Sequence, residues 1–350
     1  MTADPMSRRT RRGTSMMDVA AHARVSQKTV SRVVNGEPHV REEVRERVLR
    51  SIQELDFRPN AAARSLVTRR TRRIGVVALG TTLHGPTSAL AALESVARAD
   101  RYSLSVMRTE STDRDEIQRA VDTLLDDGAE GIVLSEPMHL EGAPLRIRED
   151  VAVLTLGARG LTARPDELVV GADEAAGGRL AAEHLLDLGH RTVHHIAGPE
   201  AWISSQLRRE GWRSVLSEHD AEIPEVVHGD WSPGSGFEAM TRLLALPITP
   251  TAVFVSNDQM AIGALSALQH AGLSSPADVS IVGFDDIDVA EFLPTPLTTL
   301  RQEFAVAAHQ GMNQLIAAID GAEPRRTQDL VPLSFVHRST TAPPRPATSR

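Results

Sequence analysis

Apolar residues in the first sixty positions recur at the spacing of short helices. Val30, Val33 and Val34 follow the i, i+3, i+4 pattern of one helix face, and Ser26 precedes them as an N-cap. Ser15 and Asp18 have the spacing of a capping box, which marks an earlier helix start. The pattern predicts three helices, over residues 18–22, 27–35 and 42–55. Because a turn of about three residues joins the first two, we expect a helix-turn-helix.

From Arg73 onward the pattern changes to short apolar runs that alternate with helical periods. The runs predict buried strands over residues 74–79, 104–107, 131–134, 151–156, 192–197, 251–256 and 279–284. The helical periods predict helices over residues 89–100, 117–125, 174–188, 205–218, 236–245 and 259–271. This βαβ alternation is typical of parallel sheets with helices on both faces. Because about 270 residues exceed what one such sheet needs, we expect a body of two doubly wound α/β lobes.

Composition limits the classes of protein that the chain can represent. Hydrophobic residues make up 41% and charged residues 24% of the 350 positions, an ordinary globular balance. The chain has no cysteine, which excludes disulfides, thiolate metal sites and cysteine nucleophiles. No stretch approaches the roughly 20 apolar residues of a membrane span. No apolar run follows the basic start, so we expect no secretory signal and a cytoplasmic location.

Charge is divided unevenly along the chain. Residues 1–73 contain 17 basic and 8 acidic residues, a net charge of +9, while the remainder carries −17. A basic segment attached to an acidic body is typical of a protein that binds a polyanion. The alternative for the first segment is a small three-helix domain with a solvated basic surface.

The second predicted helix carries side chains that suit duplex DNA. In the major groove arginine and lysine read guanine, glutamine reads adenine, and hydroxyl groups contact thymine or phosphate. Lys28 is the only lysine in the chain. The candidate DNA-binding residues here are Ser26, Gln27, Lys28, Thr29, Ser31, Arg32 and Asn35. Charge and helix arrangement agree, so we expect double-stranded DNA as a partner.

The same residues carry a resemblance to a known family. Residues 18–20 (DVA), 25–35 (VSQKTVSRVVN) and 57–66 (FRPNAAARSL) resemble the N-terminus and hinge of the lactose-repressor/galactose-repressor family of transcriptional regulators. The resemblance implies a hinge helix over residues 61–66 that forms on DNA, with Asn60 and Ala63 as DNA contacts and Leu66 as a minor-groove wedge. A helix this short is marginal in water, and an apolar wedge exchanges base stacking for protein contact. The alternative for Leu66 is the core of an ordinary linker helix.

The resemblance continues through the body, over about residues 15–340. AGP at residues 197–199, GDWS at 229–232 and NDQMA at 257–261 are similar to the family. It implies a periplasmic-binding-protein-like fold with a sugar effector between two lobes. Ligands of open parallel sheets bind beyond the carboxyl ends of the strands, and facing loops form a cleft. The candidate ligand-binding residues are Leu83, His84, Arg208, Trp231, Asn257, Asp285, Gln302 and Phe304.

The chemistry of these side chains suits a sugar. Arg208 offers a rigid fork of donors, and Asn257 can donate to a hydroxyl and accept from it. Asp285 can accept from two hydroxyls, while Trp231 and Phe304 can cover an apolar sugar face. The alternatives are a surface ion pair for Arg208, a helix cap for Asp285 and a core position for Trp231.

Two positions depart from the pocket of a family member that the chain resembles throughout. Gly157 stands where that pocket has an aspartate, and Ser135 stands where it has an amide side chain. Each change removes a hydrogen-bonding group, and such a loss can shift ligand preference strongly. We therefore expect a sugar without assigning its identity.

The expected organisation has five parts. They are a disordered basic tail over residues 1–14, a helix-turn-helix domain over 15–59, a hinge helix and linker over 60–72, a body over 73–340 and a disordered tail over 341–350. The N-terminal lobe covers about 73–172 and 302–331, and the C-terminal lobe covers about 173–301 and 332–340. The last ten residues contain prolines and no heptads, so we expect a homodimer without a further helix.

These observations predict a transcriptional repressor that binds a pseudo-palindromic operator as a dimer. A sugar, galactoside-like or another, would lower its DNA affinity. The alternatives are a regulator of the same family that its ligand corepresses, a sugar-binding protein without a transcriptional role, and an architectural DNA-binding protein.

We expect no enzyme, cofactor or metal site. Asp285 and Asp286 are sequence neighbours after a strand, which is a poor geometry for acid/base catalysis. His194 and His195 face opposite sides of a strand, so both cannot bind one metal. The chain also has no glycine-rich phosphate loop.

Overall fold

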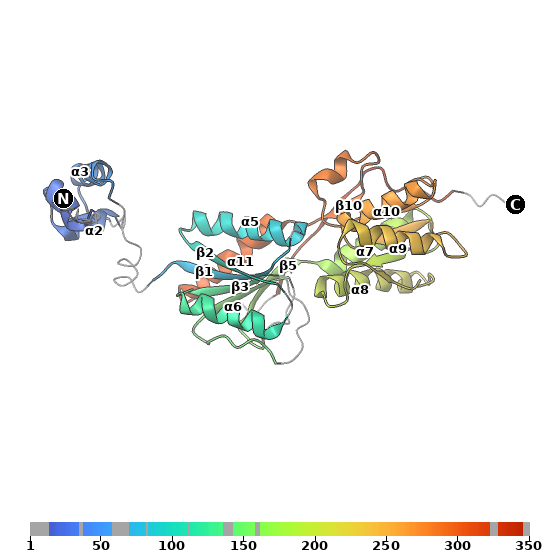
Figure 1. Cartoon of the computed structure of the whole chain (residues 1–350), viewed down its shortest axis with the longest axis horizontal. Helices are drawn as coiled ribbons and strands as arrows, with labels where there is room; N and C mark the ends of the chain where they lie inside the picture. Colours follow the sequence, from blue (N-terminus) through green and yellow to red (C-terminus); the bar gives the residue numbers. More distant parts are fainter. Residues whose placement is uncertain are drawn as a thin grey trace, which may run out of the picture. The chain divides into compact units, whose positions relative to one another are not determined.

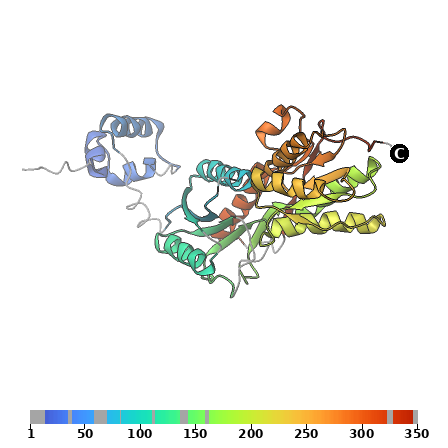
Figure 2. The same cartoon turned by 45° about the vertical axis from the view of Figure 1, so that its right-hand side comes forward.

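The computed structural model describes residues 14–34, 38–57, 70–81, 83–110, 113–135, 143–157, 162–322 and 328–345. The chain divides into two compact units, residues 1–71 and 72–350 (Figures 1 and 2). Most of the expected N-terminal tail, the expected hinge helix, and the candidate DNA contacts Asn35, Asn60, Ala63 and Leu66 lie outside the described residues.

In its described residues, the N-terminal unit contains three helices around a small apolar core. They are α1 (Met16–His22), α2 (Gln27–Val34) and α3 (Glu42–Glu54). Val19, Val30 and Val48 are fully buried, one from each helix. Burial of a valine side chain stabilises a fold by about 1.5–3 kcal/mol relative to exposure. The Ser15–Asp18 capping box forms as predicted, with both of its hydrogen bonds present.

The N-terminal lobe of the body is built on a six-stranded parallel sheet. Its strands lie in the order β11-β5-β4-β3-β1-β2. Their bounds are β1 (Arg73–Leu79), β2 (Ser103–Thr109), β3 (Gly131–Ser135), β4 (Ala152–Leu156), β5 (Leu168–Ala172) and β11 (Gln328–Val331). Helices α5 (His84–Ala99) and α11 (Phe304–Ile319) cover one face, and α6 (Arg114–Asp126) covers the other (Figure 1).

The C-terminal lobe repeats this architecture with a smaller sheet. Its parallel strands lie in the order β7-β6-β8-β9, with bounds Val227–His228, His194–Ala197, Ala252–Val255 and Ser280–Val282. Helices α7 (Glu174–Asp187) and α8 (Ile203–Glu218) pack on one face around Trp212 and Phe254. Helices α9 (Pro233–Leu244) and α10 (Asp258–His270) pack on the other. A short 3₁₀ helix, η1 (Asp288–Phe292), follows β9.

The chain passes between the lobes three times. Strand β5 ends at Ala172 and α7 begins at Glu174, and β11 is followed by β12 (Ser334–Val336). Strand β10 (Thr299–Arg301) pairs antiparallel with β12 and leads into α11. A parallel α/β body of two lobes was predicted from the sequence, and this fold class is confirmed.

Several helices begin earlier than expected, α5, α6 and α9 by three residues or more. Helix α5 starts at His84 instead of residue 89, and α9 starts at Pro233 instead of residue 236. Both first turns contain a proline, Pro86 in α5 and Pro233 in α9. A proline is tolerated in the first turn because its missing N–H has no partner there in any case.

The expected disordered tail is wrong for residues 341–345. The Ser280 hydroxyl donates to the carbonyl of Ala342 at 2.9 Å, and Arg345 pairs with Asp278 at 2.7 Å. One residue earlier, the carbonyl of Thr340 accepts from the Ile281 amide at 2.8 Å. This segment therefore covers the edge of β9, where unpaired backbone groups would otherwise remain.

Candidate functional site

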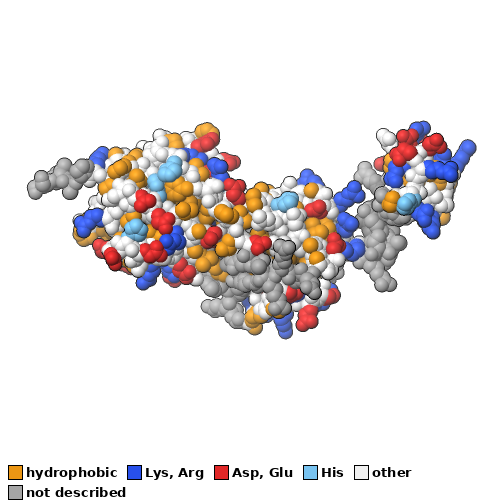
Figure 3. Space-filling view, turned by 180° about the vertical axis from the view of Figure 1, so that it is seen from behind, with side chains coloured by type: hydrophobic (Ala, Val, Ile, Leu, Met, Phe, Trp, Pro, Cys, Tyr) orange, Lys and Arg blue, Asp and Glu red, His pale blue; other side chains and the backbone are white. Residues whose placement is uncertain are grey.

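The exposed side of α2 carries the polar residues that the sequence selected. Gln27, Lys28 and Arg32 are exposed, while Val30 and Val33 on the opposite side are buried. The Ser26 hydroxyl accepts from the Thr29 amide at 3.1 Å, so it caps the helix as predicted. On the face seen in Figure 3, basic side chains lie around the outline of the N-terminal unit, together with acidic ones.

Cross-helix bonds fix the turn that precedes α2. The Arg47 guanidinium on α3 donates from Nε to the Ala23 carbonyl at 2.9 Å. His22 contacts the Ser51 hydroxyl at 3.1 Å, and Arg24 in the turn has a φ of 53°. These contacts hold α1 and the turn against α3, which leaves the outer side of α2 accessible.

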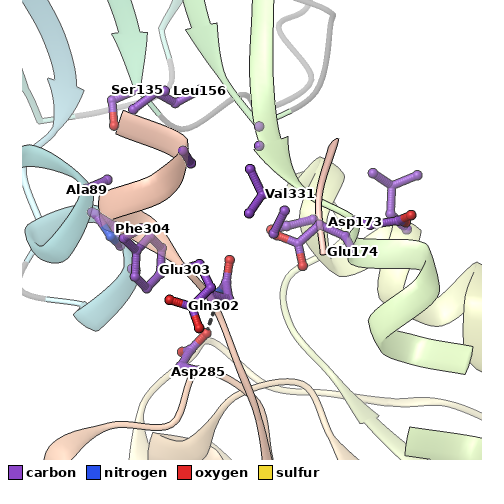
Figure 4. Close-up of a pocket in the computed structure, with 18 of the residues that line it drawn as sticks. Ala89, Ser135, Leu156, Asp173, Glu174, Asp285, Gln302, Glu303, Phe304 and Val331 are labelled. Atoms are coloured by element: carbon purple, nitrogen blue, oxygen red, sulfur yellow. Dashed lines mark hydrogen bonds between the residues drawn. The ribbon is translucent and has the colours of Figure 1, made fainter. Parts of the chain in front are cut away.

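The body contains a cavity of about 250 Å³ between its two lobes. The structure brings all eight predicted ligand-binding residues together around it. In Figure 4 Phe304, Gln302 and Asp285 lie on one side of this space, and Val331, Asp173 and Glu174 lie across it. The carboxyl ends of the strands therefore converge here, as the rule for open parallel sheets requires.

The polar end of the cavity is organised around the Arg208 guanidinium. Its Nε and Nη2 atoms donate to the two carboxylate oxygens of Glu174, at 2.7 and 3.2 Å. Nη1 donates to the carbonyl of Ser256 at 2.5 Å. The guanidinium lies 3.7 Å from the ring centre of Phe284 and is 5% exposed. Arg208 is therefore a buried and paired cation, and the surface ion pair considered from sequence is wrong.

Asn257 is engaged more fully than its sequence role implied. Its side-chain oxygen accepts from the Met260 amide at 2.9 Å and so caps α10. Its side-chain nitrogen donates to the carbonyl of Trp231 at 3.1 Å. The capping bond fixes the Asn257 side chain on α10, and its bond to the Trp231 carbonyl then holds the tryptophan backbone in place. One N–H of the Asn257 side-chain amide is left for a ligand.

Asp285 is held at the junction of the two lobes. Its carboxylate accepts from the Gln302 side chain at 2.7 Å and lies 4.0 Å from Arg208 Nη2. Burial raises the pKa of Asp285 to about 6, against the opposing effect of the Arg208 charge. Its φ of 113° is in the left-handed region, a strained conformation typical of functional positions. Asp285 caps no helix, so that alternative is wrong.

An aromatic wall borders the polar end. Trp231 is 5% exposed and packs edge-on against Trp202, with ring centres 5.5 Å apart. Phe304 makes a similar contact with His84 at 5.9 Å. Trp231 belongs both to the core of the C-terminal lobe and to the cavity wall. The predicted role as a ligand-facing ring and the alternative of a core position are therefore compatible. Leu83, at the start of α5, also lines the cavity.

Gly157 and Ser135, the two departures from the related pocket, also line the cavity. Gly157 has a φ of 108°, and its Cα would lie 2.5 Å from a Cβ at Gly171. The backbones of Gly157 and Gly171 are therefore in direct contact, and there is no room for a side chain at position 171. The N-terminal lobe presents mainly apolar side chains to the cavity, among them Leu156, Val170 and Leu330.

Sequence reasoning missed the acidic residues of the cavity. Asp173, Glu174 and Glu303 line it, and Glu174 is the principal partner of Arg208. Glu174 follows directly after a parallel strand, so the rule for strand ends would have selected it if β5 had been recognised. The sequence analysis assigned no strand to these residues, LVVGA.

His194 and His195 behave as two separate groups. His195 is fully buried between the rings of Trp212 and Phe254, and burial lowers its pKa to about 3. His194 lies on the opposite face of β6 and is half-buried. Among the described residues no group of three or more His, Cys, Asp or Glu side chains could hold a metal ion. None of the described helices is both long and apolar enough to cross a membrane.

Comparisons with known proteins agree with both parts of the chain. Residues 15–60 match the family described as bacterial regulatory proteins, lacI family, and residues 182–341 match a periplasmic binding protein-like domain. The chain is 35% identical to the lactose operon repressor of Escherichia coli K12 over 340 residues, which cover 96% of this chain and 92% of the relative. It is 33% identical to the ribose operon repressor of the same organism, over 82% of this chain and 88% of the relative.

A solved structure of the Lac repressor dimer bound to operator and the anti-inducer ONPF is also similar. The TM-score is 0.80 at 32% identity, and the match covers 94% of this chain and 99% of that chain. Fold, site and relatives together define the class of DNA-binding transcriptional repressors that respond to small molecules. The chain belongs to the lacI family of bacterial regulatory proteins.

Proposed function

We propose that this protein represses transcription as a homodimer bound to a pseudo-palindromic operator, and that a sugar in the cleft between its lobes releases it. The observation that carries the proposal is the cavity on which Arg208, Asp285, Asn257 and the aromatic wall converge. Polar groups that fix orientation beside apolar surface are the usual composition of a small-molecule site.

DNA recognition is assigned to α2. Gln27, Lys28 and Arg32 are exposed along one side of this helix, and their donors suit base edges and phosphates in the major groove. A similar structure is a dimer bound to operator DNA, which supports two recognition helices about one DNA turn apart. Asn35, Asn60, Ala63 and Leu66 complete the proposed contacts. Since its target is chromosomal DNA, the protein acts in the bacterial cytoplasm.

The size of the cavity favours a small sugar. At about 250 Å³ it lies just below the roughly 300–1,000 Å³ typical of sites for drug-sized ligands. The Asp285 carboxylate and the remaining N–H groups of Arg208 and Asn257 can bond to hydroxyl groups. Trp231 and Phe304 can cover the C–H face of the ring. Leu83, His84 and Gln302 complete the proposed ligand contacts.

The position of the cavity explains how a ligand could change DNA affinity. Glu174 and Gln302 each lie within three residues of a segment that passes between the lobes. A ligand that contacts both lobes favours one relative arrangement of them, and the change is transmitted to the linker at residues 70–72. Such coupling is typically about 1–3 kcal/mol and is reciprocal, so operator DNA should weaken sugar binding by the same factor.

The test is to select an operator from a random duplex library and titrate it by fluorescence anisotropy with and without neutral sugars. The expected result is a specific palindromic site whose affinity falls when one sugar is present. Affinity that rises with sugar would instead indicate a corepressor. Equal binding to all duplexes would refute sequence-specific repression, and a thermal-shift response to sugars would then indicate only a sugar-binding protein.

A further inference from the structure

The cation in the cleft is already neutralised by the protein. Glu174 receives two hydrogen bonds from Arg208, at 2.7 and 3.2 Å, and its side chain is 12% exposed. Such a two-pronged pair is the geometry with which arginine would otherwise bind the carboxylate or phosphate of a ligand. The place that an acidic ligand would need on Arg208 is therefore occupied by Glu174.

Other contacts prevent Arg208 from turning to a ligand. Its guanidinium lies between the carbonyl of Ser256, 2.5 Å away, and the face of Phe284, 3.7 Å away. Glycine lies at the contact between the two helices, because a Cβ at Gly178 would be 2.1 Å from the Arg208 carbonyl. The backbone and side chain of Arg208 are thus both fixed, and the ion pair with Glu174 is part of the cavity wall.

The remaining charges of the cavity are acidic. Among the described residues that line it, Asp173, Glu174, Asp285 and Glu303 face one arginine and His84. Asp173 and Glu174 lie at the N-terminus of α7, where the helix dipole stabilises negative charge. The one arginine and the four carboxylates of the lining together carry a net charge of −3.

We propose that Glu174 determines the specificity of the effector site, so that the cleft accepts uncharged sugars and rejects sugar acids. This inference rests on the proposed function and adds the chemical class of the sugar. A carboxylate brought into this low-dielectric cavity would meet like charges without a free cation to pair with, which opposes its binding.

The test compares matched sugars on the full-length protein by calorimetry near neutral pH. The probes are galactose with galacturonate, glucose with glucuronate, and mannose with mannuronate. For the pair whose neutral member binds best, the acid should bind at least about tenfold more weakly, a difference of about 1.4 kcal/mol. An acid that binds as tightly as its neutral partner would overturn the inference.

Variants assign this discrimination to Glu174. Glu174→Gln should reduce it to about threefold or less, because the buried Arg208 charge is then no longer neutralised and attracts an acid from its fixed position. Glu174→Asp retains the charge and should retain the discrimination. The matched control is Glu218→Gln, which removes the exposed bidentate pair of Arg179 and Glu218 (2.7 and 2.8 Å) with the same change of charge.

The outcomes separate this inference from the proposed function. An unchanged discrimination factor in Glu174→Gln, or an equal loss in Glu218→Gln, would refute the role of Glu174 while sugar binding stands. A lack of response to every neutral sugar would refute the proposed function, and the inference with it. If Glu174→Gln fails to fold, the wild-type comparison and Glu174→Asp still decide, since loss of discrimination in Glu174→Asp would contradict a role of the charge.

Discussion

Replacement of Gly211 by alanine should separate the two helices that hold the ion pair of the cleft. Gly211 on α8 faces α7, and a Cβ at this position would lie 2.0 Å from the carbonyl oxygen of Ala175. Across the same contact, a Cβ at Gly178 would lie 2.1 Å from the carbonyl oxygen of Arg208. Both obstructing atoms belong to helix backbone, so they cannot move aside by a change of rotamer. The helices must move apart.

The magnitude follows from two opposing effects. Overpacking of a filled core costs about 1–3 kcal/mol and occasionally more, and here a rigid backbone places the cost at the upper end. Alanine gains about 1 kcal/mol of helix propensity over glycine. The net loss of stability should be about 2 kcal/mol, which lowers the Tm of a lobe of this size by about 4–8 °C. Effector affinity should fall as well, because Glu174 and Arg208 lie on the two separated helices.

Thermal unfolding by circular dichroism measures this effect, and Gly234→Ala is the matched control. Gly234 lies in the first turn of α9, and the nearest atom to a Cβ there is the Ser232 hydroxyl at 3.8 Å. Its replacement should leave Tm unchanged or raise it slightly. The double variant Gly178→Ala/Gly211→Ala should lose less than the sum of the two single changes, because one separation relieves both clashes. A Gly211→Ala protein as stable as wild type would refute the close helix contact.

Three further predictions concern the two binding surfaces. Arg32→Ala should cost about 1–3 kcal/mol on the selected operator if Arg32 reads a base, and a uniform loss on unrelated duplexes would assign it to phosphate. Lys28 should be protected from amine-reactive labelling by operator but not by sugar, as peptide mass spectrometry would detect; unchanged labelling would exclude it from the interface. Sugar affinity should fall up to about tenfold per pH unit below about pH 6, where the Asp285 carboxylate becomes protonated. Calorimetry should find this dependence lost in Asp285→Asn, and its persistence there would assign it to another group.

Ionisation of Asp285 has opposite effects on folding stability and on sugar affinity as the pH rises. Burial raises the pKa of Asp285 from 3.8 to about 6, so the folded state binds a proton that the unfolded state releases between these values. The corresponding stability is present below about pH 4 and is lost as the pH rises through about 6. Without a ligand, the ionised Asp285 carboxylate therefore destabilises the folded state. A sugar hydroxyl that donates a hydrogen bond to this carboxylate offsets part of the destabilisation.

Local periodicity was sufficient to predict most of the architecture. The valines of α2 and the capping box of α1 are patterns within one turn or two of helix, and both appear in the structure as expected. The starts of α5 and α9 were predicted too late, and the first turns that were missed contain Pro86 and Pro233. Strands as short as β7 or β10 have no periodicity to recognise, since they contain two and three residues.

The sequence predicted which residues line the cavity better than it predicted how their side chains are bonded. All eight candidate residues line it, because strand-end loops must converge whatever their side chains do. How each side chain bonds depends on residues that are distant in sequence. Arg208 and Glu174 are separated by 34 positions, and Asn257 is separated from Trp231 by 26. Sequence spacing cannot show that the donors of Arg208 are taken by a carboxylate or that the amide of Asn257 caps a helix. A motif shared with a sugar-binding relative therefore locates a site, but the partners of its charged groups decide which sugar it can admit.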